Sequence, residues 1–389
     1  MIIPGNFVVT SQVPESIALT NPIKKIRLSL LLVIASVFFF SACSSDDDVS
    51  SPSEQESDGD AGDSDENGEP GGTGDEPTVE VDSVSLAPNG CQNVVILGEF
   101  AYAACETGIE IVDLISLERN FVSIPADDIT GDASLGVLFV QSGSSVTQLD
   151  LVDPLAPNAI NTVNTNFSLF SGISAASGVL VVSAGSGGSN TEVYTYDANS
   201  LSLSISGIAQ VDSQTGNPDV HVAQTTDGVL AFYSQDLGLV ANWGIQIVEF
   251  DTDGNIVEIP EVVVLTPGPF TGGFGVPFAP ANIPVESEFL NEQLYVAHFA
   301  ANGLEVIDLS ASDEPSVIPL GYEPTNVATD GSQLFVVSVD RSIVDTVDPI
   351  TETVIESLSL PLQQAVGVAA NLTHIAVADR SAGLIIAVR

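Results

Sequence analysis

Basic side chains are nearly absent from this sequence. Its 389 residues include 52 Asp and Glu against 7 Lys and Arg, which gives a formal net charge of −45. All of the acidic residues except Glu15 follow residue 43, whereas this part of the chain contains only four arginines and no lysine. Such a surface repels the phosphates of nucleic acids and the headgroups of anionic lipids, so the sequence excludes nucleic acid as a partner. A charge this far from zero favours a soluble protein, and we expect a monomer.

Helical periodicity is also missing. No long stretch repeats apolar residues every 3.6 positions, and the second part of the chain consists of short Val-, Ile- and Leu-rich runs separated by glycine-containing turns. The hydrophobic content of 44% is ample for a core. The sequence therefore predicts an all-β fold.

The N-terminal apolar run is too short to span a bilayer. It covers residues 28–40, whereas a spanning helix needs about 20 residues, and it follows Lys24, Lys25 and Arg27. A basic segment before a short apolar run is typical of a secretory signal. Residues 1–22 fit no part of such a signal, which leaves either an unusually long N-terminal region or a start codon placed too far upstream.

The apolar run ends in Phe40-Ser41-Ala42-Cys43. Small residues at the two positions before a cysteine resemble the lipobox of bacterial lipoproteins, although that family usually has Leu where Phe40 stands. The resemblance implies that Cys43 is acylated and becomes the mature N-terminus, which anchors the protein in the outer membrane or at the cell surface. The alternative is an ordinary signal peptide cut near Ala42, with Cys43 incidental.

Residues 43–78 contain almost no large apolar side chain and are mainly Ser, Asp, Glu, Gly and Pro. Such a segment cannot bury enough apolar surface to offset its chain entropy, and its like charges repel one another. We expect a disordered, extended, acidic tether here. It joins the extension and signal peptide of residues 1–42 to a folded domain that begins at residue 79.

The domain repeats one unit. Its clearest copy joins the strings 293–298 (QLYVAH) and 303–308 (GLEVID), each of which has the pattern of an apolar strand. Seven copies align, at 100–104 with 108–113, 137–140 with 146–150, 179–182 with 192–197, 229–232 with 244–248, 293–298 with 303–308, 334–337 with 343–348, and 374–378 with 383–388. Divided among seven copies, residues 83–389 give about 44 residues each, the size of a four-stranded propeller blade.

These strands are apolar on both faces, as sheets packed between neighbouring sheets must be. The sequence therefore predicts a seven-bladed β-propeller. The GLEVID-like and LYVA-like strings resemble the LVIVD-repeat propeller proteins of bacterial cell surfaces and, more loosely, the YVTN-type propellers. The resemblance implies the fold and a place in the cell envelope, and it says little about function.

The last copy ends with its third strand at the C-terminus, one strand short of a blade. Residues 79–86 alternate apolar and polar side chains, as an outer strand does. We expect this segment to supply the missing fourth strand, so that the domain 79–389 closes without an open edge.

Cys91 and Cys105 lie symmetrically about a hairpin turn near Gly98. Residues so placed face each other across two strands at a separation that a disulfide can bridge. Export would place them in an oxidising compartment. We expect a disulfide, and the alternative is two buried free thiols.

Few residues suggest chemistry. Aspartates end most third strands, and because Asp often caps tight turns we expect a turn role rather than a ring of carboxylates for Asp113, Asp150, Asp197 and Asp308. His221, His298 and His374 are spread over three units, and no second His or Cys stands at metal-ligand spacing from any of them. His221 falls on an innermost strand and can face the channel. We therefore predict no catalytic residue and no cofactor, with a divalent metal in the channel as the minor alternative.

One Gly- and Pro-rich insertion, residues 267–278, departs from the repeat. It carries Phe270, Phe274 and Phe278, with Trp243 in a nearby loop. Loop aromatics often serve recognition, so this is a candidate binding loop. The alternative is a plug that packs against the blades.

These observations favour a lipid-anchored propeller that binds a protein or small-molecule ligand. The alternatives are an enzyme on the same fold, such as a lactonase-like hydrolase with a metal in the channel, and an accessory lipoprotein of envelope assembly. The fold itself does not choose among them.

Closure through the N-terminal segment can be tested by deleting residues 79–87. The deletion leaves the last blade without its outer strand, and we expect the thermal unfolding transition to collapse to much lower temperature. An unchanged melting curve would reject closure.

Overall fold

The computed structural model describes residues 81–82, 85–87, 90–165, 172–184, 190–206, 220–225, 228–236, 243–251, 253–258, 263–264, 286–297, 302–310 and 315–389. The chain divides into two compact units, residues 1–78 and 79–389, and every described residue belongs to the second. The signal segment, Cys43, the tether and the insertion 267–278 lie outside the described residues.

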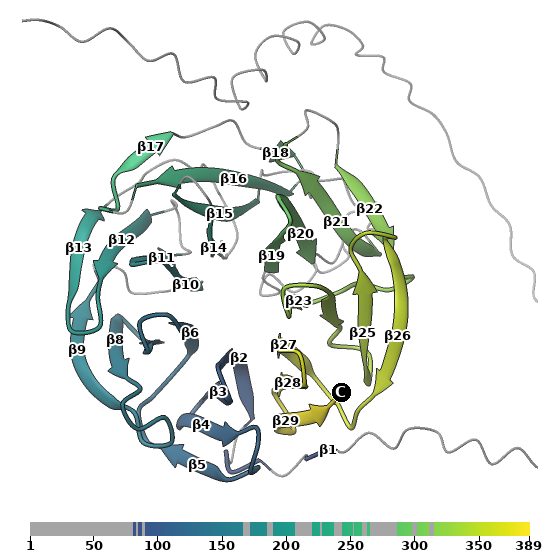
Figure 1. Cartoon of the computed structure of the whole chain (residues 1–389), viewed down its shortest axis with the longest axis horizontal. Helices are drawn as coiled ribbons and strands as arrows, with labels where there is room; N and C mark the ends of the chain where they lie inside the picture. Colours follow the sequence, from purple (N-terminus) through teal and green to yellow (C-terminus); the bar gives the residue numbers. More distant parts are fainter. Residues whose placement is uncertain are drawn as a thin grey trace, which may run out of the picture. The chain divides into compact units, whose positions relative to one another are not determined.

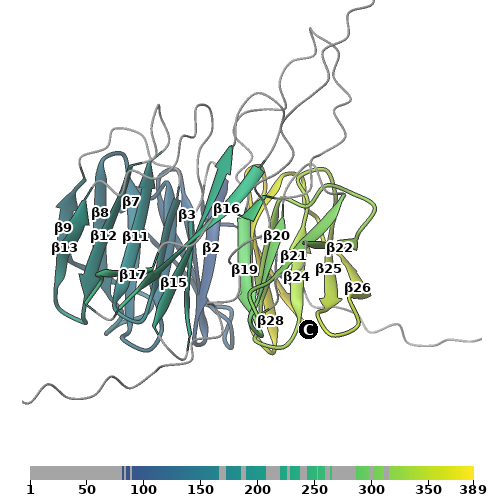
Figure 2. The same ribbon diagram turned by 90° about the horizontal axis from the view of Figure 1, so that it is seen from above.

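Seven antiparallel sheets follow one another around a central channel (Figure 1). Figure 2 shows them from the side, with the strands of each blade running across the thickness of the ring. Blades 1 to 3 consist of β2 (Cys91–Leu97), β3 (Phe100–Cys105), β4 (Gly108–Asp113) and β5 (Arg119–Val122); β6 (Asp128–Asp132), β7 (Val137–Ser142), β8 (Ser145–Asp150) and β9 (Asn158–Asn164); and β10 (Gly172–Ala176), β11 (Val179–Ala184), β12 (Asn190–Tyr196) and β13 (Leu201–Ser206).

The other four blades follow the same order. They consist of β14 (Val220–Gln224), β15 (Val229–Asp236), β16 (Trp243–Phe250) and β17 (Ile256–Glu258), with β18 (Val263–Val264) also paired to β16; β19 (Glu286–Leu290), β20 (Gln293–Ala297), β21 (Gly303–Asp308) and β22 (Ser316–Pro319); β23 (Asn326–Thr329), β24 (Leu334–Val337), β25 (Ile343–Asp348) and β26 (Thr353–Ser359); and β27 (Ala365–Ala370), β28 (His374–Asp379), β29 (Gly383–Val388) and β1 (Val81–Asp82). The predicted seven-bladed β-propeller is confirmed, and the LYVA-like and GLEVID-like strings form the second and third strands of every blade.

The apolar core is divided among the contacts between blades. The described residues form seven clusters, and each cluster joins two consecutive blades, the seventh with the first included. Strand β28 shows how: Ile375 and Val377 face blade 6, whereas Ala376 and Ala378 face blade 1. Because side chains alternate along a strand, a strand between two neighbouring blades buries side chains on both of its faces, so most of its positions are apolar. This is the physical reason for the unbroken apolar runs of the sequence.

The aspartates that end the third strands have the predicted turn role. In each of four blades the carboxylate accepts a hydrogen bond from the backbone N–H two residues further on, as Asp113 does from Ile115 at 2.8 Å. The other three pairs are Asp150 with Val152, Asp197 with Asn199, and Asp308 with Ser310. These carboxylates therefore hold the connection to the fourth strand and do not converge on a site.

The ring closes through the N-terminal strand. β1 pairs antiparallel with β29, with Val81 opposite Ala387 and Asp82 opposite Ile386, and β1 lies within the segment for which alternation predicted an outer strand. In the same seam the innermost strands β27 and β2 contact each other, and the Cys91–Cys105 disulfide lies in the apolar cluster that joins blades 7 and 1. The expected disulfide is thus present in the structure.

Arg119 and Glu110 fasten β1 to blade 1. The Arg119 guanidinium contacts Asp82 of β1 at 3.1 Å and Glu110 of β4 at 2.6 Å. The Glu110 carboxylate is fully buried and also accepts hydrogen bonds from the Ser85 hydroxyl and from the backbone N–H groups of Leu86 and Ala87. One buried carboxylate therefore holds the connection between β1 and β2 in place.

Two further arginines, both in blade 7, contact residues of the neighbouring blades. Arg380 donates to the Gln92 side chain of blade 1 at 2.9 Å. Arg389, at the C-terminus, contacts Asp330 of blade 6 at 2.6 Å and lies over the Phe335 ring at 4.5 Å. Three of the four arginines of the domain thus join segments near the two chain ends, where covalent continuity is lacking.

Glycine is required at this seam. Gly383 has a φ of +86°, and a Cβ at this position would stand 2.1 Å from the Ser85 hydroxyl oxygen. Gly90 has a φ of +74°, and its Cβ would stand 2.0 Å from the Arg380 carbonyl oxygen. Both contacts are shorter than atoms allow, so a side chain here would force the two ends of the ring apart.

Replacing Arg119 with Met tests whether the contacts of Arg119 with Glu110 and Asp82 stabilise the closed ring. The buried Glu110 carboxylate would lose its cation, and breaking a buried ion pair by removing one partner typically costs about 3 kcal/mol or more. We expect the free energy of unfolding to fall by about this amount, measured by chemical denaturation. The matched control is Arg341→Met, because Arg341 stands over the Tyr322 ring at 4.8 Å and such contacts contribute about 1 kcal/mol or less. Equal losses in the two variants would contradict the role given to Glu110.

Candidate ligand site in the central channel

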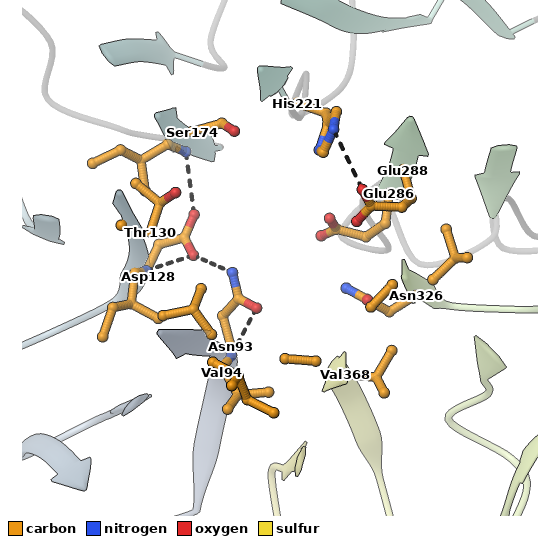
Figure 3. Close-up of a pocket in the computed structure, with 18 of the residues that line it drawn as sticks. Asn93, Val94, Asp128, Thr130, Ser174, His221, Glu286, Glu288, Asn326 and Val368 are labelled. Atoms are coloured by element: carbon orange, nitrogen blue, oxygen red, sulfur yellow. Dashed lines mark hydrogen bonds and ion pairs between the residues drawn. The ribbon is translucent and has the colours of Figure 1, made fainter. Parts of the chain in front are cut away.

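The first strand of every blade faces a cavity of about 270 Å³ at the centre of the ring. Its lining comes from β2, β6, β10, β14, β19, β23 and β27, which are the innermost strands (Figure 3). Because each blade contributes one short stretch of strand, the composition of the site is set by a few polar residues among apolar ones. The carboxyl groups are those of Asp128, Glu286 and Glu288, and the lining includes no Lys or Arg.

Asp128 is held by three hydrogen bonds. It accepts from the Asn93 side-chain amide at 2.7 Å, from its neighbour Ile129 N–H at 2.8 Å, and from the Ile173 N–H at 3.3 Å. These donors belong to blades 1, 2 and 3, so the carboxylate ties three innermost strands together. Burial raises the pKa of Asp128 to about 6 even against these hydrogen bonds, which lower it.

His221 and Glu288 meet on the opposite wall. The His221 Nε2 atom lies 3.8 Å from a Glu288 carboxyl oxygen, which is too far for a hydrogen bond. Burial raises the pKa of Glu288 to about 8 and lowers that of His221 to about 4. Both side chains are therefore mainly uncharged at neutral pH, and the contact is not an ion pair.

Aromatic rings support this wall from behind. The His221 ring stacks on Phe232 with 6.1 Å between centroids, and Phe232 stacks on Phe289 at 5.6 Å. The rings keep water from one side of the pair and so explain the strong effect of burial on both pKa values.

Two other polar side chains point at the cavity without a partner. Asn326 is 5% exposed and Thr130 is 8% exposed, and neither side chain has a hydrogen-bond partner among the described residues. Figure 3 shows the Asn326 amide directed into the channel, across from Asn93. Their polar atoms line the cavity and are therefore available to hydrogen-bond a polar ligand.

A metal cage is not preassembled in the channel. In the part of the chain that the structure describes, one group of three His, Cys, Asp or Glu side chains has its ligand atoms within 4.8 Å of one another, and it consists of Cys91, Cys105 and Glu110. The two sulfurs of this group form a disulfide and the carboxylate binds Arg119. The group is therefore structural.

The residues proposed from the sequence fall into three groups. Cys91 and Cys105 are joined, as expected. Cys43, Phe270, Phe274 and Phe278 lie outside the described residues, so the candidate binding loop stays a prediction. Trp243 is the first residue of β16, opposite Asp236 in register.

Of the two described histidines, His221 lines the channel and His374 does not. Sequence reasoning placed His221 on an innermost strand but missed Asp128, Glu288 and Asn326 around it. Each stands next to another polar residue near the start of an innermost strand, as in Asp127-Asp128, Ser287-Glu288 and Thr325-Asn326, and the sequence alone does not distinguish such residues from turn residues. The signal that would have found them is their shared place in the repeat, on the strand before each LYVA-like string.

No family model matches the chain, and no curated protein matches its sequence. Among solved structures it is similar to virginiamycin B lyase from Staphylococcus aureus, with a TM-score of 0.54 and 12% identity over 80% of this chain and 99% of the lyase. It is also similar to the WD40 β-propeller domain of Doa1, with a TM-score of 0.53 and 10% identity over 80% of this chain and 95% of that domain. At such low identity the likeness shows the fold alone, which is the β-propeller.

The burial of Glu288 predicts a pH-dependent stability. Its pKa of about 8 in the folded protein lies above its ordinary value of 4.5, so the folded state binds the extra proton between these values. The stability contribution is complete below pH 4.5 and is lost as the pH rises through about 8. We expect Glu288→Gln to unfold like the wild type at acid pH and to be the more stable protein at alkaline pH.

Chemical denaturation over a pH series measures this difference. The control is Glu106→Gln, which removes a carboxylate from an exposed turn. A gain in Glu288→Gln that does not change with pH would show that the carboxyl is not desolvated.

Proposed function

We propose that this protein is an exported, lipid-anchored β-propeller that binds a small polar ligand in its central channel and acts as a binding platform in the outer membrane or at the cell surface. The observation that carries the proposal is the pair of buried, unpartnered side chains, Asn326 and Thr130, in a cavity lined by carboxyl groups. Such a cavity is stabilised by an occupant that offers hydrogen bonds.

Three features support export and anchoring. The basic and apolar segments that end at Cys43 have the pattern of a lipoprotein signal. The disulfide between Cys91 and Cys105 suits an oxidising compartment outside the cytoplasm. The repeat strings resemble those of LVIVD-repeat envelope proteins. Among the described residues no helix is long and apolar enough to cross a membrane, and in this proposal the attachment is through the lipid on Cys43.

A second candidate is a propeller hydrolase of the lactonase type. The contact between His221 and Glu288 favours it, because a carboxyl group kept protonated beside a neutral imidazole can serve as an acid and a base. The separation of the channel side chains weighs against the metal-dependent form of this candidate. Binding without chemistry therefore accounts for more of the site.

Cys43→Ser tests the anchor. The wild-type protein should incorporate labelled palmitate and sediment with membranes, whereas the variant, which lacks the acylated thiol, should incorporate none and shift to the soluble exported fraction. Cys105→Ser with Cys91→Ser serves as a control that removes the other two cysteines, with their disulfide, and keeps Cys43. A variant Cys43→Ser that stays with membranes would contradict lipid anchoring.

Metal content separates binding from metal-dependent hydrolysis. Purified protein is dialysed against metal-free buffer and its bound metal is measured by mass spectrometry. A stoichiometric divalent metal that is lost in a His221→Ala variant would favour the hydrolase over the binding platform.

A further inference from the structure

The charge of the channel restricts what it can hold. Its lining carries the carboxyl groups of Asp128, Glu286 and Glu288 and no Lys or Arg, and its histidine is neutral at pH 7. An anion would enter this cavity without a charge partner and would be repelled by Asp128. The occupant is therefore neutral or cationic.

The unpartnered side chains add an independent requirement. Asn326 is at least nine-tenths buried, points into the cavity and has no hydrogen-bond partner among the described residues (Figure 3). Its side-chain carbonyl accepts and its NH2 group donates, the Thr130 hydroxyl can do both, and the carboxylates only accept once ionised. The carboxylates tip the balance of the lining toward acceptors, which favours a ligand that brings several N–H or O–H donors.

We propose that the channel ligand is a small organic ammonium ion, with the Glu288 carboxylate as its charge partner and the Asn326 side-chain carbonyl as a hydrogen-bond acceptor. This inference rests on the proposed function and specifies its ligand. An ammonium group supplies three donors and one positive charge, which matches both requirements.

Cavity size and spacing favour such a ligand over a bare metal ion. No three His, Cys, Asp or Glu side chains of the described channel residues have ligand atoms within 4.8 Å of one another, whereas a bare cation needs ligands gathered around one point. A volume of about 270 Å³ is close to the lower limit for small-molecule pockets. It therefore suits a compound of several heavy atoms.

Binding should release a proton. Glu288 is mainly protonated at pH 7, and an ammonium ion beside it would favour the charged form. The titratable groups around it are His221 on β14 at 3.8 Å, Glu286 on its own strand, Tyr295 opposite it in register on β20, and Asp128 across the channel. Burial lowers the pKa of His221 to about 4 and raises those of Asp128 to about 6, Glu288 to about 8 and Tyr295 to about 12, so among these four groups Glu288 is the one protonated at pH 7 that an adjacent cation can ionise. The carboxyl proton passes to the buffer as the ion pair forms.

Calorimetric titration of the full-length mature protein tests the inference. The probes are putrescine, the neutral diol of the same chain length, succinate and Ca²⁺, each at about pH 7 in about 0.5 M NaCl, where attraction to the acidic surface is screened. We expect putrescine to bind with saturation at one site and the other three to bind at least about tenfold more weakly. Repeating the titration in buffers of different ionisation enthalpy should show the release of about one proton per putrescine.

Three variants locate the site. Glu288→Gln should weaken putrescine binding about tenfold or more and abolish proton release, because the amide cannot ionise. Asn326→Ala should weaken binding and keep proton release. Glu106→Gln, on the surface, should change neither. Proton release is a readout that a merely structural role of Glu288 would not alter.

The outcomes separate the inference from the function on which it rests. Binding of the diol, succinate or Ca²⁺ in preference to putrescine would overturn the ammonium ligand and leave a ligand-binding channel in place. Binding of putrescine that Glu288→Gln and Asn326→Ala leave unchanged would overturn the location. Failure of all four probes to bind would overturn both the ammonium ligand and the proposed channel function.

Discussion

Burial of apolar side chains between consecutive sheets is the interaction on which the structure depends. Each blade is too thin to have a core of its own, so every apolar cluster is shared by two blades, and the seventh contact closes only if the last blade is complete. The contact between blades 7 and 1 therefore affects the stability of all the other contacts between blades. Its contacts differ from the rest: alanines from both blades pack there beside the Cys91–Cys105 disulfide, and arginines cross it. A chain with four arginines in its whole domain places Arg119, Arg380 and Arg389 near its two ends.

The same closure creates the channel. Polar groups such as Asp128 and Glu288 are taken out of water because seven innermost strands surround them, and their pKa values move accordingly. The difference between the two walls follows from their neighbours. Asp128 is held by donors from three blades, whereas Glu288 faces a neutral histidine backed by phenylalanine rings. One wall is thus fixed by its own hydrogen bonds, and the other is open to a donor from outside.

The fold was predictable from the sequence because a propeller strand packs against two neighbouring blades and its sequence is therefore apolar on both faces. Runs such as 334–337 are apolar at every position, and their sevenfold recurrence predicted the number of blades. The tight-turn role of Asp113 and its equivalents, and the pairing of Cys91 with Cys105, followed from local geometry. The candidate site did not, because Glu288 and Asn326 belong to different blades and converge only once the ring is closed. The register of an innermost strand decides whether a polar residue faces the channel or the neighbouring blade, and this register cannot be read from the sequence.

The attachment of β1 has a mechanical consequence. Any tension applied through the N-terminal segment enters the propeller at Val81 and Asp82, which form only a two-residue pairing with β29. The load then passes through the Arg119 guanidinium to Glu110 and to the backbone amides of Leu86 and Ala87. These bonds lie beside the strand and add to its two-residue pairing, so peeling the ring open must also break them. A pull on the chain would therefore be resisted by one buried carboxylate as well as by the strand itself.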